Sequence, residues 1–205
     1  MKKRIILGFL FLLTAVAFAQ NLEEVCASLA EHPNTTGNFV QVKTIQTNGR
    51  KLKSNGTYII STEGILWQTE KPVPSSLILT KNSVVQIAAN GKKSVMDGRD
   101  NQMFANISET LSSVLSGDAA ALRKNFNCDF TINNDGQWSV KLEPKDSTIA
   151  SVMKTLVLSG TYQQYAIMTS LVMQEASDNE IRYEFLNQKF PKDLSADEKQ
   201  IFVLE

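Results

Sequence analysis

The stretch between residues 53 and 80 constrains the fold of this chain more than any other part of its sequence. Three short runs of β-branched, aliphatic and aromatic residues follow one another there, and turn-forming residues separate them. Runs in which apolar and polar side chains alternate predict antiparallel strands with one buried face. Pro72 and Pro74 lie between the second and third runs, and proline has no N–H to donate to a sheet. The stretch therefore predicts a hairpin, a connection and a third strand.

One face of the second predicted strand carries a large aromatic surface. Ile65, Trp67 and Thr69 alternate along this strand, so their side chains point to the same side of the sheet. Trp67 has two interpretations here. It is either an ordinary core residue or part of a surface that receives an apolar ligand.

The strand pattern continues on both sides of this stretch. Asn-Gly turns at residues 48–49 and 90–91 are strong hairpin signals. Together the runs predict ten or eleven antiparallel strands, and a sheet of that size curls into a barrel or half-barrel. The other expected strands cover residues 39–45, 84–88, 92–96, 126–132, 138–142, 156–158, 166–175 and 181–186, and residues 190–205 are expected to form one helical turn and a last strand.

Helices are predicted near the N-terminus and in the middle of the chain. Asn21 and Glu24 form a capping box that begins a short amphipathic helix. Between residues 103 and 115 apolar side chains recur at helical spacing, and Asp118 can cap a second short helix at residues 119–125. The concave side of the sheet is the simplest place to bury their apolar faces. The expected fold class is mainly β (α+β), a curved antiparallel sheet forming an incomplete β-barrel with a helical lid over a hydrophobic cavity.

Residues 1–19 have the features of a secretory signal peptide. Three basic residues precede an apolar run, and Ala17-Phe18-Ala19 matches the small-residue pattern of a cleavage site. The apolar run is too short for a membrane-spanning helix. We therefore expect residues 20–205 to form a single exported, soluble domain.

Charge and motif content argue against several classes of function. Removal of the signal would leave 18 of the 21 basic residues against all 21 acidic residues, which gives no basic field for nucleic acid or an anionic membrane. The one histidine, His32, precedes a proline in an expected loop, so a surface position is expected. No nucleophile motif, zinc motif or phosphate-binding loop is present. We expect a protein that is not an enzyme and that uses no metal or cofactor.

Cys26 and Cys128 are the two cysteines of the chain. In an exported protein such a pair predicts a disulfide bond, here between the first helix and a distant strand. The alternative is two buried free thiols, because cysteine packs as a small apolar residue.

Several short motifs resemble, in their order and spacing, those of the LolA-like outer-membrane lipoprotein carriers. They are Phe39-Val40-Gln41, residues 54–58, Leu66-Trp67 with Lys71-Pro72, Leu115-Ser116-Gly117-Asp118, and residues 138–144. The resemblance implies an incomplete barrel with a helical lid. It also implies a periplasmic carrier that shields the acyl chains of lipoproteins between the inner and outer membranes. An inner-membrane exporter of the ABC type and an outer-membrane acceptor would be its partners, and the carrier itself is expected to be a monomer.

The resemblance assigns Ile65 and Trp67 to positions that line the cavity in this family. With the strand and helix patterns, it predicts one ligand-binding surface. Its residues are Phe39, Tyr58, Ile65, Trp67 and Leu79 from the sheet, and Met103, Ile107, Leu111 and Leu115 from the lid helix.

One turn departs from the pattern of the family's lipoprotein carriers. They have an Arg-Pro before the tryptophan strand, and its arginine holds the lid closed. Here the turn is Thr62-Glu63-Gly64, one residue shorter and without arginine. The stretch between residues 66 and 80 is more similar to a branch associated with export of other outer-membrane lipids, such as polyene-lipid conjugates. Two alternatives therefore stay open: a carrier of a lipid other than a lipoprotein, and a protein-binding or sensor module on the same fold.

Overall fold

The computed structural model describes residues 21–80, 83–97, 113 and 118–203. The predicted signal peptide and, apart from Ser113, the predicted helix at residues 103–115 lie outside these residues. The helices and strands are α1 (Leu22–Ala30), β1 (Thr35–Thr44), β2 (Lys51–Ile60), β3 (Ile65–Lys71), β4 (Ser75–Leu79), β5 (Ser83–Ile87), β6 (Lys93–Asp97), α3 (Ala119–Asn125), β7 (Phe126–Ile132), β8 (Gln137–Pro144), α4 (Ser147–Ala150), β9 (Met153–Tyr162), β10 (Ala166–Glu175), β11 (Glu180–Lys189) and α5 (Ala196–Gln200).

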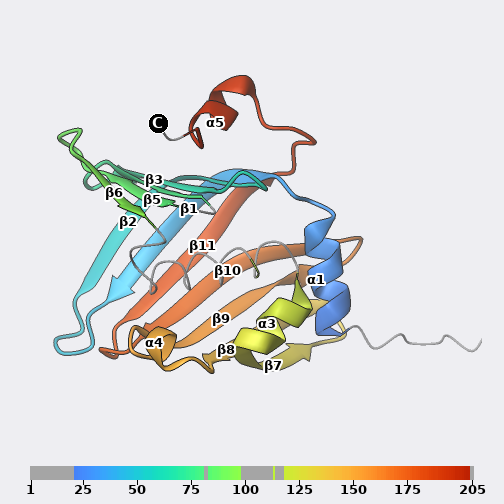
Figure 1. The fold of residues 1–205 in the computed structure, drawn as a ribbon. Coiled ribbons are helices and arrows are strands. Elements are labelled where there is room, and N and C mark those ends of the chain that lie inside the picture. The colour runs from blue at the N-terminus through green and yellow to red at the C-terminus, as the bar shows by residue number, and fades with distance from the viewer. Residues whose placement is uncertain (1–20, 81–82, 98–112, 114–117, 204–205) are drawn as a thin grey trace, which may run out of the picture.

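The strands of the described chain form one 11-stranded antiparallel sheet. Its order is β6-β5-β4-β3-β2-β1-β11-β10-β9-β8-β7, so β6 and β7 are the two edges and the sheet does not close. The sheet curves strongly, as Figure 1 shows. The predicted fold class, a curved antiparallel sheet that forms an incomplete barrel, is confirmed. The one long-range step in the order is the pairing of β1 with β11, which joins the two halves of the chain.

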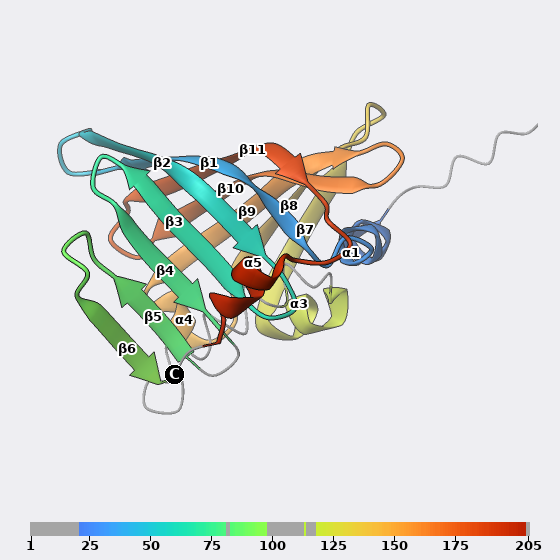
Figure 2. The ribbon, with the colours of Figure 1, turned by 90° about the horizontal axis from the view of Figure 1, so that it is seen from above.

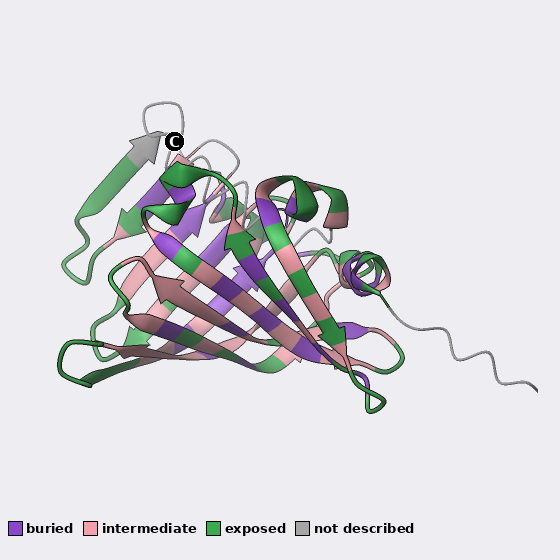
Figure 3. Cartoon of the chain, turned by 90° about the horizontal axis from the view of Figure 1, so that it is seen from below, coloured by how far each residue is buried: buried purple, intermediate pink, exposed green. Residues whose placement is uncertain are grey.

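Side chains alternate between the two faces of the sheet. We call the concave side, on which α1 and α3 lie, the inner face, and the opposite side the outer face (Figures 1 and 2). The alternation of buried and exposed positions along the strands can be followed in Figure 3. The large hydrophobic core lies on the inner face, and a second, smaller cluster lies on the outer face of β2 to β5.

Two glycines allow the sheet to curve where backbones or rings approach closely. A Cβ atom on Gly56 would lie 1.9 Å from the carbonyl oxygen of Gln68. Gly56 lies at a β-bulge, where β3 has one extra residue relative to β2. A Cβ on Gly160 would lie 2.7 Å from the ring of Trp138, its partner on β8. Bulges bend a strand and increase its twist, and glycine makes room for the approach.

The short helices begin at the predicted caps. The side chain of Asn21 accepts a hydrogen bond from the backbone N–H of Glu24, and Asp118 accepts one from Ala121. α1 is fixed to the sheet by the backbone N–H of Ala166, which donates to the hydroxyl of Ser28 over 2.8 Å. In the described residues no helix has the length and apolar character needed to cross a membrane.

The C-terminal segment leaves the sheet and covers its outer face. Leu194 and Phe202 pack against Ile59, Leu66, Ile78 and Val85. Residues 201–203 are a turn and coil, so the predicted last strand is wrong. The helical turn was predicted correctly, and it lies beside β3 in Figure 2. Burial of two large apolar side chains on the outer face outweighs further strand pairing here.

Candidate ligand-binding site

The centre of the inner face is a cluster of aromatic rings. Five rings come from four neighbouring strands, β3, β2, β1 and β11: Phe39, Tyr58, Trp67, Tyr183 and Phe185. Ring centroids lie 5.0 Å apart for Tyr58 and Phe185 and 5.6 Å apart for Trp67 and Tyr183. These spacings are typical of packed aromatic pairs.

Part of this apolar face is accessible rather than sealed. Phe39 and Tyr58 are fully buried, whereas Trp67 and Tyr183 are half-buried. The half-buried set extends the apolar surface across the inner face, and it includes Leu29, Trp67, Leu77, Phe130, Ile132, Met168, Met173 and Tyr183. Partly exposed aromatic, leucine and methionine side chains on one concave surface suit an adaptable apolar ligand.

The polar atoms within the aromatic cluster are neutral. Burial raises the pKa of Tyr183 to about 12 and raises that of Tyr58 still further. The indole Nε1 of Trp67 is buried and has no hydrogen-bond partner. Since a phenol with a raised pKa stays protonated at neutral pH, both tyrosine hydroxyls are uncharged on this face.

A small cavity lies on the inner face beside the end of α1. Its volume is about 40 Å³, and Leu29, His32, Tyr58, Met168, Phe185 and Phe190 are among its lining residues. One buried water needs about 10–15 Å³ by the same measure, so the cavity has room for about three. It is large enough for the end of an acyl chain and too small for a whole one.

His32 is not the surface residue predicted from the sequence. Its ring centroid lies 4.6 Å from that of Tyr165 and 4.7 Å from that of Phe190, and its Nε2 is buried. The predicted loop position is correct. The pairing of β1 with β11 places Phe190, in the loop after β11, beside His32. This contact depends on long-range strand pairing, so the sequence around His32 does not indicate it.

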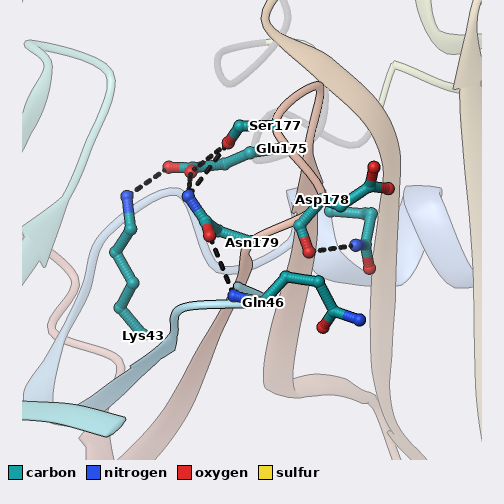
Figure 4. A network of polar contacts seen from close by, with 7 residues as sticks. Lys43, Gln46, Glu175, Ser177, Asp178 and Asn179 are labelled. Carbon is teal, nitrogen blue, oxygen red and sulfur yellow. Dashed lines mark hydrogen bonds and ion pairs between the residues drawn. The ribbon is translucent and has the colours of Figure 1, made fainter. Parts of the chain in front are cut away.

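A polar network borders the apolar surface at one end of the inner face, which we call the hairpin end because the β1–β2 and β10–β11 turns lie there. The ammonium group of Lys43 lies 2.7 Å from a carboxylate oxygen of Glu175, whose other oxygen accepts hydrogen bonds from Ser177 and Asn179 (Figure 4). Burial alone raises the pKa of Glu175, but the bonds from Lys43, Asn179 and Ser177 outweigh it and lower the pKa overall. Beside this network Ser54 donates to Gln41.

The two cysteines are free thiols in the structure, so the predicted disulfide is not formed in it. Burial raises the pKa of Cys26 to about 11, and the nearby carboxylate of Glu23 adds to this rise. Burial raises the pKa of Cys128 as well. The bond remains a prediction for the oxidised protein.

Comparison with known protein families identifies the family of this chain. The family model described as outer membrane lipoprotein carrier protein LolA matches residues 32–201, well over half of the chain. The chain belongs to the LolA family. No curated protein matches its sequence. The family match confirms the resemblance that Phe39-Val40-Gln41, Leu66-Trp67 and residues 138–144 indicated.

Three solved structures have distant likenesses to this LolA-family chain. A domain assigned as an outer membrane lipoprotein-sorting protein from Vibrio parahaemolyticus is 8% identical and covers 89% of this chain and 99% of its own, with a TM-score of 0.42. A DUF1329 family protein from Desulfovibrio piger is 8% identical over 85% and 92%, with a TM-score of 0.47. Lipoprotein LppX of Mycobacterium tuberculosis is 10% identical over 85% and 97%, with a TM-score of 0.43.

The structure places the predicted site residues of the sheet together. Phe39, Tyr58, Ile65 and Leu79 are buried on the inner face, and Trp67 is half-buried among them. The predicted lid residues Met103, Ile107, Leu111 and Leu115 lie outside the described residues. Sequence reasoning missed Tyr183 and Phe185, although the alternation of Ile181, Tyr183 and Phe185 in a predicted strand was the signal that could have found them. In the described residues no group of His, Cys, Asp and Glu could hold a metal ion.

Proposed function

We propose that this LolA-family protein is a periplasmic carrier that shields acyl chains on its inner face while the cargo moves from the inner to the outer membrane. The half-buried aromatic surface of the inner face, in a member of a carrier family, is the observation that carries the proposal. The cargo is an acylated lipoprotein or a related lipid. The carrier is a monomer without catalytic activity or cofactor, exported by a signal at residues 1–19. It takes the cargo from an inner-membrane exporter and gives it to an outer-membrane acceptor.

The energetics favour a site that covers the cargo only in part. Full burial of one sixteen-carbon chain would contribute about 12 kcal/mol at ~0.8 kcal/mol per methylene. Three such chains would exceed the practical limit of about 20 kcal/mol for non-covalent binding. A carrier that must release its cargo therefore benefits from a site that is partly open, as the half-buried residues of the inner face are.

The turn at residues 61–64 favours a lipid other than a lipoprotein as a second candidate cargo. Ser61 organises this turn by accepting from the backbone N–H groups of Glu63 and Gly64. No arginine stands in it, whereas the family's lipoprotein carriers use one there to hold the lid. The inner face fits both cargoes because both present acyl chains.

Native mass spectrometry of the protein purified from its own periplasm tests the proposal. We expect a bound species that fragments to an acylated lipoprotein or a free lipid, which also identifies the cargo. In a second experiment, the lipid-free protein should transfer a fluorescent diacylated peptide from donor to acceptor vesicles. A protein that carries no lipid and does not bind the diacylated peptide would refute the carrier function.

A further inference from the structure

The ends of three neighbouring hairpins form a basic edge of the molecule. The β1–β2, β3–β4 and β5–β6 turns lie side by side because their strands are consecutive in the sheet (Figure 2). We call this edge the basic rim; it consists of Arg50, Lys51, Leu52, Lys53, Lys71, Val73, Lys92 and Lys93. The network around Lys43 and Glu175 lies next to it, at the β10–β11 turn.

The charge of the basic rim is concentrated at one edge of the sheet. It contains six of the 21 basic residues of the chain, and Glu70 is the one acidic residue adjoining them in these turns. All six are exposed, and no ion pair joins any of them to another residue that the structure describes. The acidic residues of the neighbouring β10–β11 turn are already paired, Glu175 with Lys43, Asp178 with Lys154 and Glu180 with Arg182.

Two apolar side chains project among these lysines. Leu52 is 43% exposed and lies between Lys51 and Lys53, and Val73 is 61% exposed and lies two residues after Lys71. Leu52 is the register partner of Lys43, so the rim is continuous with the polar end of the inner face. Hairpin ends that present lysines beside exposed apolar side chains match the interface of a bilayer, where phosphates pair with the lysines and the apolar side chains enter the headgroup layer.

We propose that the basic rim docks on the surface of a bilayer that contains anionic phospholipids. Docking turns the hairpin end of the inner face toward the membrane that supplies or receives a ligand. Each lysine near an anionic surface strengthens binding roughly fivefold, so several together give a reversible attachment. The balanced composition of the chain conceals this surface, because the compensating acidic residues lie elsewhere in the fold.

Vesicle co-sedimentation of the purified, lipid-free protein tests the docking. We expect binding to vesicles of phosphatidylglycerol and phosphatidylcholine, and none to phosphatidylcholine alone. Raising the salt to about 0.5 M should release the protein, since screening shortens the reach of the charges to a few ångströms. The triple variant Lys51→Gln/Lys53→Gln/Lys71→Gln should bind about a hundredfold more weakly, and Val73→Ser roughly threefold to tenfold more weakly.

A matched variant separates the rim from overall charge. Lys189→Gln/Lys192→Gln/Lys199→Gln removes the same charge from three exposed lysines outside the rim, and it should bind the anionic vesicles as wild type does. Equal weakening of both triple variants, or binding of wild type without preference for anionic vesicles, would overturn the proposal. Thermal unfolding confirms that each variant is folded. The assay contains no cargo, so its outcome is independent of whether the inner face binds acyl chains.

Discussion

At the scale of the residue, Trp67 best distinguishes an ordinary hydrophobic core from a ligand-binding surface on the inner face. It shares its strand face with Ile65, which is 4% exposed and belongs to the core. Trp67 itself is half-buried and packs against Tyr58 and Tyr183, with an indole N–H that has no partner. A ligand on the inner face would contact Trp67 before it contacted Ile65.

Truncation of Trp67 should therefore weaken binding more than folding. We expect Trp67→Ala to lower the affinity for a fluorescent fatty-acyl probe roughly tenfold to a hundredfold, because about 1.5–3 kcal/mol of apolar contact is lost. Gln68→Ala, on the same strand with an exposed side chain, is the control and should bind as wild type does. Probe titration with parallel thermal unfolding is the measurement. Unchanged affinity in a folded Trp67→Ala protein would contradict a binding role for this residue.

The two thiols provide the second prediction at this scale. In the oxidising compartment we expect Cys26 and Cys128 to be joined, and the closure of a loop of about 100 residues would stabilise the fold by up to about 4 to 5 kcal/mol. Because burial raises both pKa values, the bond should form slowly. Peptide mapping without reductant measures it. Recovery of both residues as free, slowly alkylating thiols would leave the reduced pair seen in the structure as the native form.

At the scale of the element, the C-terminal segment acts as a cover for the outer face. Phe202 is buried with Leu66 and Ile78, whereas its neighbour Val203 is 58% exposed. This segment replaces the last strand that the sequence predicted.

Phe202→Ala should lower the free energy of unfolding by about 3 kcal/mol, in the range for large-to-small changes in a core. The adjacent change Val203→Ala should alter it by less than about 0.5 kcal/mol, as exposed substitutions do. Urea denaturation of both variants makes the comparison. Similar small effects of the two changes would show that the segment is not held on the sheet.

The Lys43–Glu175 network ties the β1–β2 hairpin to the β10–β11 turn. Because the folded pKa of Glu175 lies below 4.5, its ion pair stabilises the fold above that pH, and the contribution is lost as the pH falls through the folded value. Glu175→Gln should cost about 1–3 kcal/mol at pH 7 and flatten the decline in stability between pH 5 and pH 3. The exposed pair of Glu143 with Lys141 is the control, and Glu143→Gln should change stability by at most about 1 kcal/mol. Melting temperatures measured across this pH range decide between them.

At the scale of the whole molecule, the open sheet gives one chain two different surfaces. The inner face is apolar and partly accessible, whereas the outer face is closed by the C-terminal segment at β2 to β5. The edge strands β6 and β7 do not pair with each other, so the curved sheet stays open. Its concave side carries α1 and α3.

Export is the prediction that concerns the chain as a whole. We expect the protein isolated from cells to begin at Gln20 and to carry no lipid attached to its own N-terminus, because no cysteine follows the cleavage pattern directly. Intact-mass measurement distinguishes this from a retained signal or a diacylglycerol adduct, either of which would contradict the prediction.

Local sequence patterns predicted most of the strands and helices and the face of the sheet on which their side chains lie. Strand alternation is local, so it located residues 126–132 and 166–175 to the residue and put Ile65 and Trp67 on one face. Helix capping is also local, and Asn21 and Asp118 begin the helices that the sequence predicted. The motif order was sufficient to indicate the LolA family.

Which side chains meet on the inner face depends on the pairing of strands that are distant in the sequence. The aromatic cluster needs β1 to pair with β11, and a period of two residues gives the face of a strand without giving its partner. The same pairing brings Phe190 to His32 and adds Tyr183 and Phe185 to Tyr58 and Trp67. The basic rim follows from the order of six strands, which brings turns far apart in the sequence to one edge. The composition gives only the net charge of the chain, whereas the positions of the charged residues in space depend on the fold.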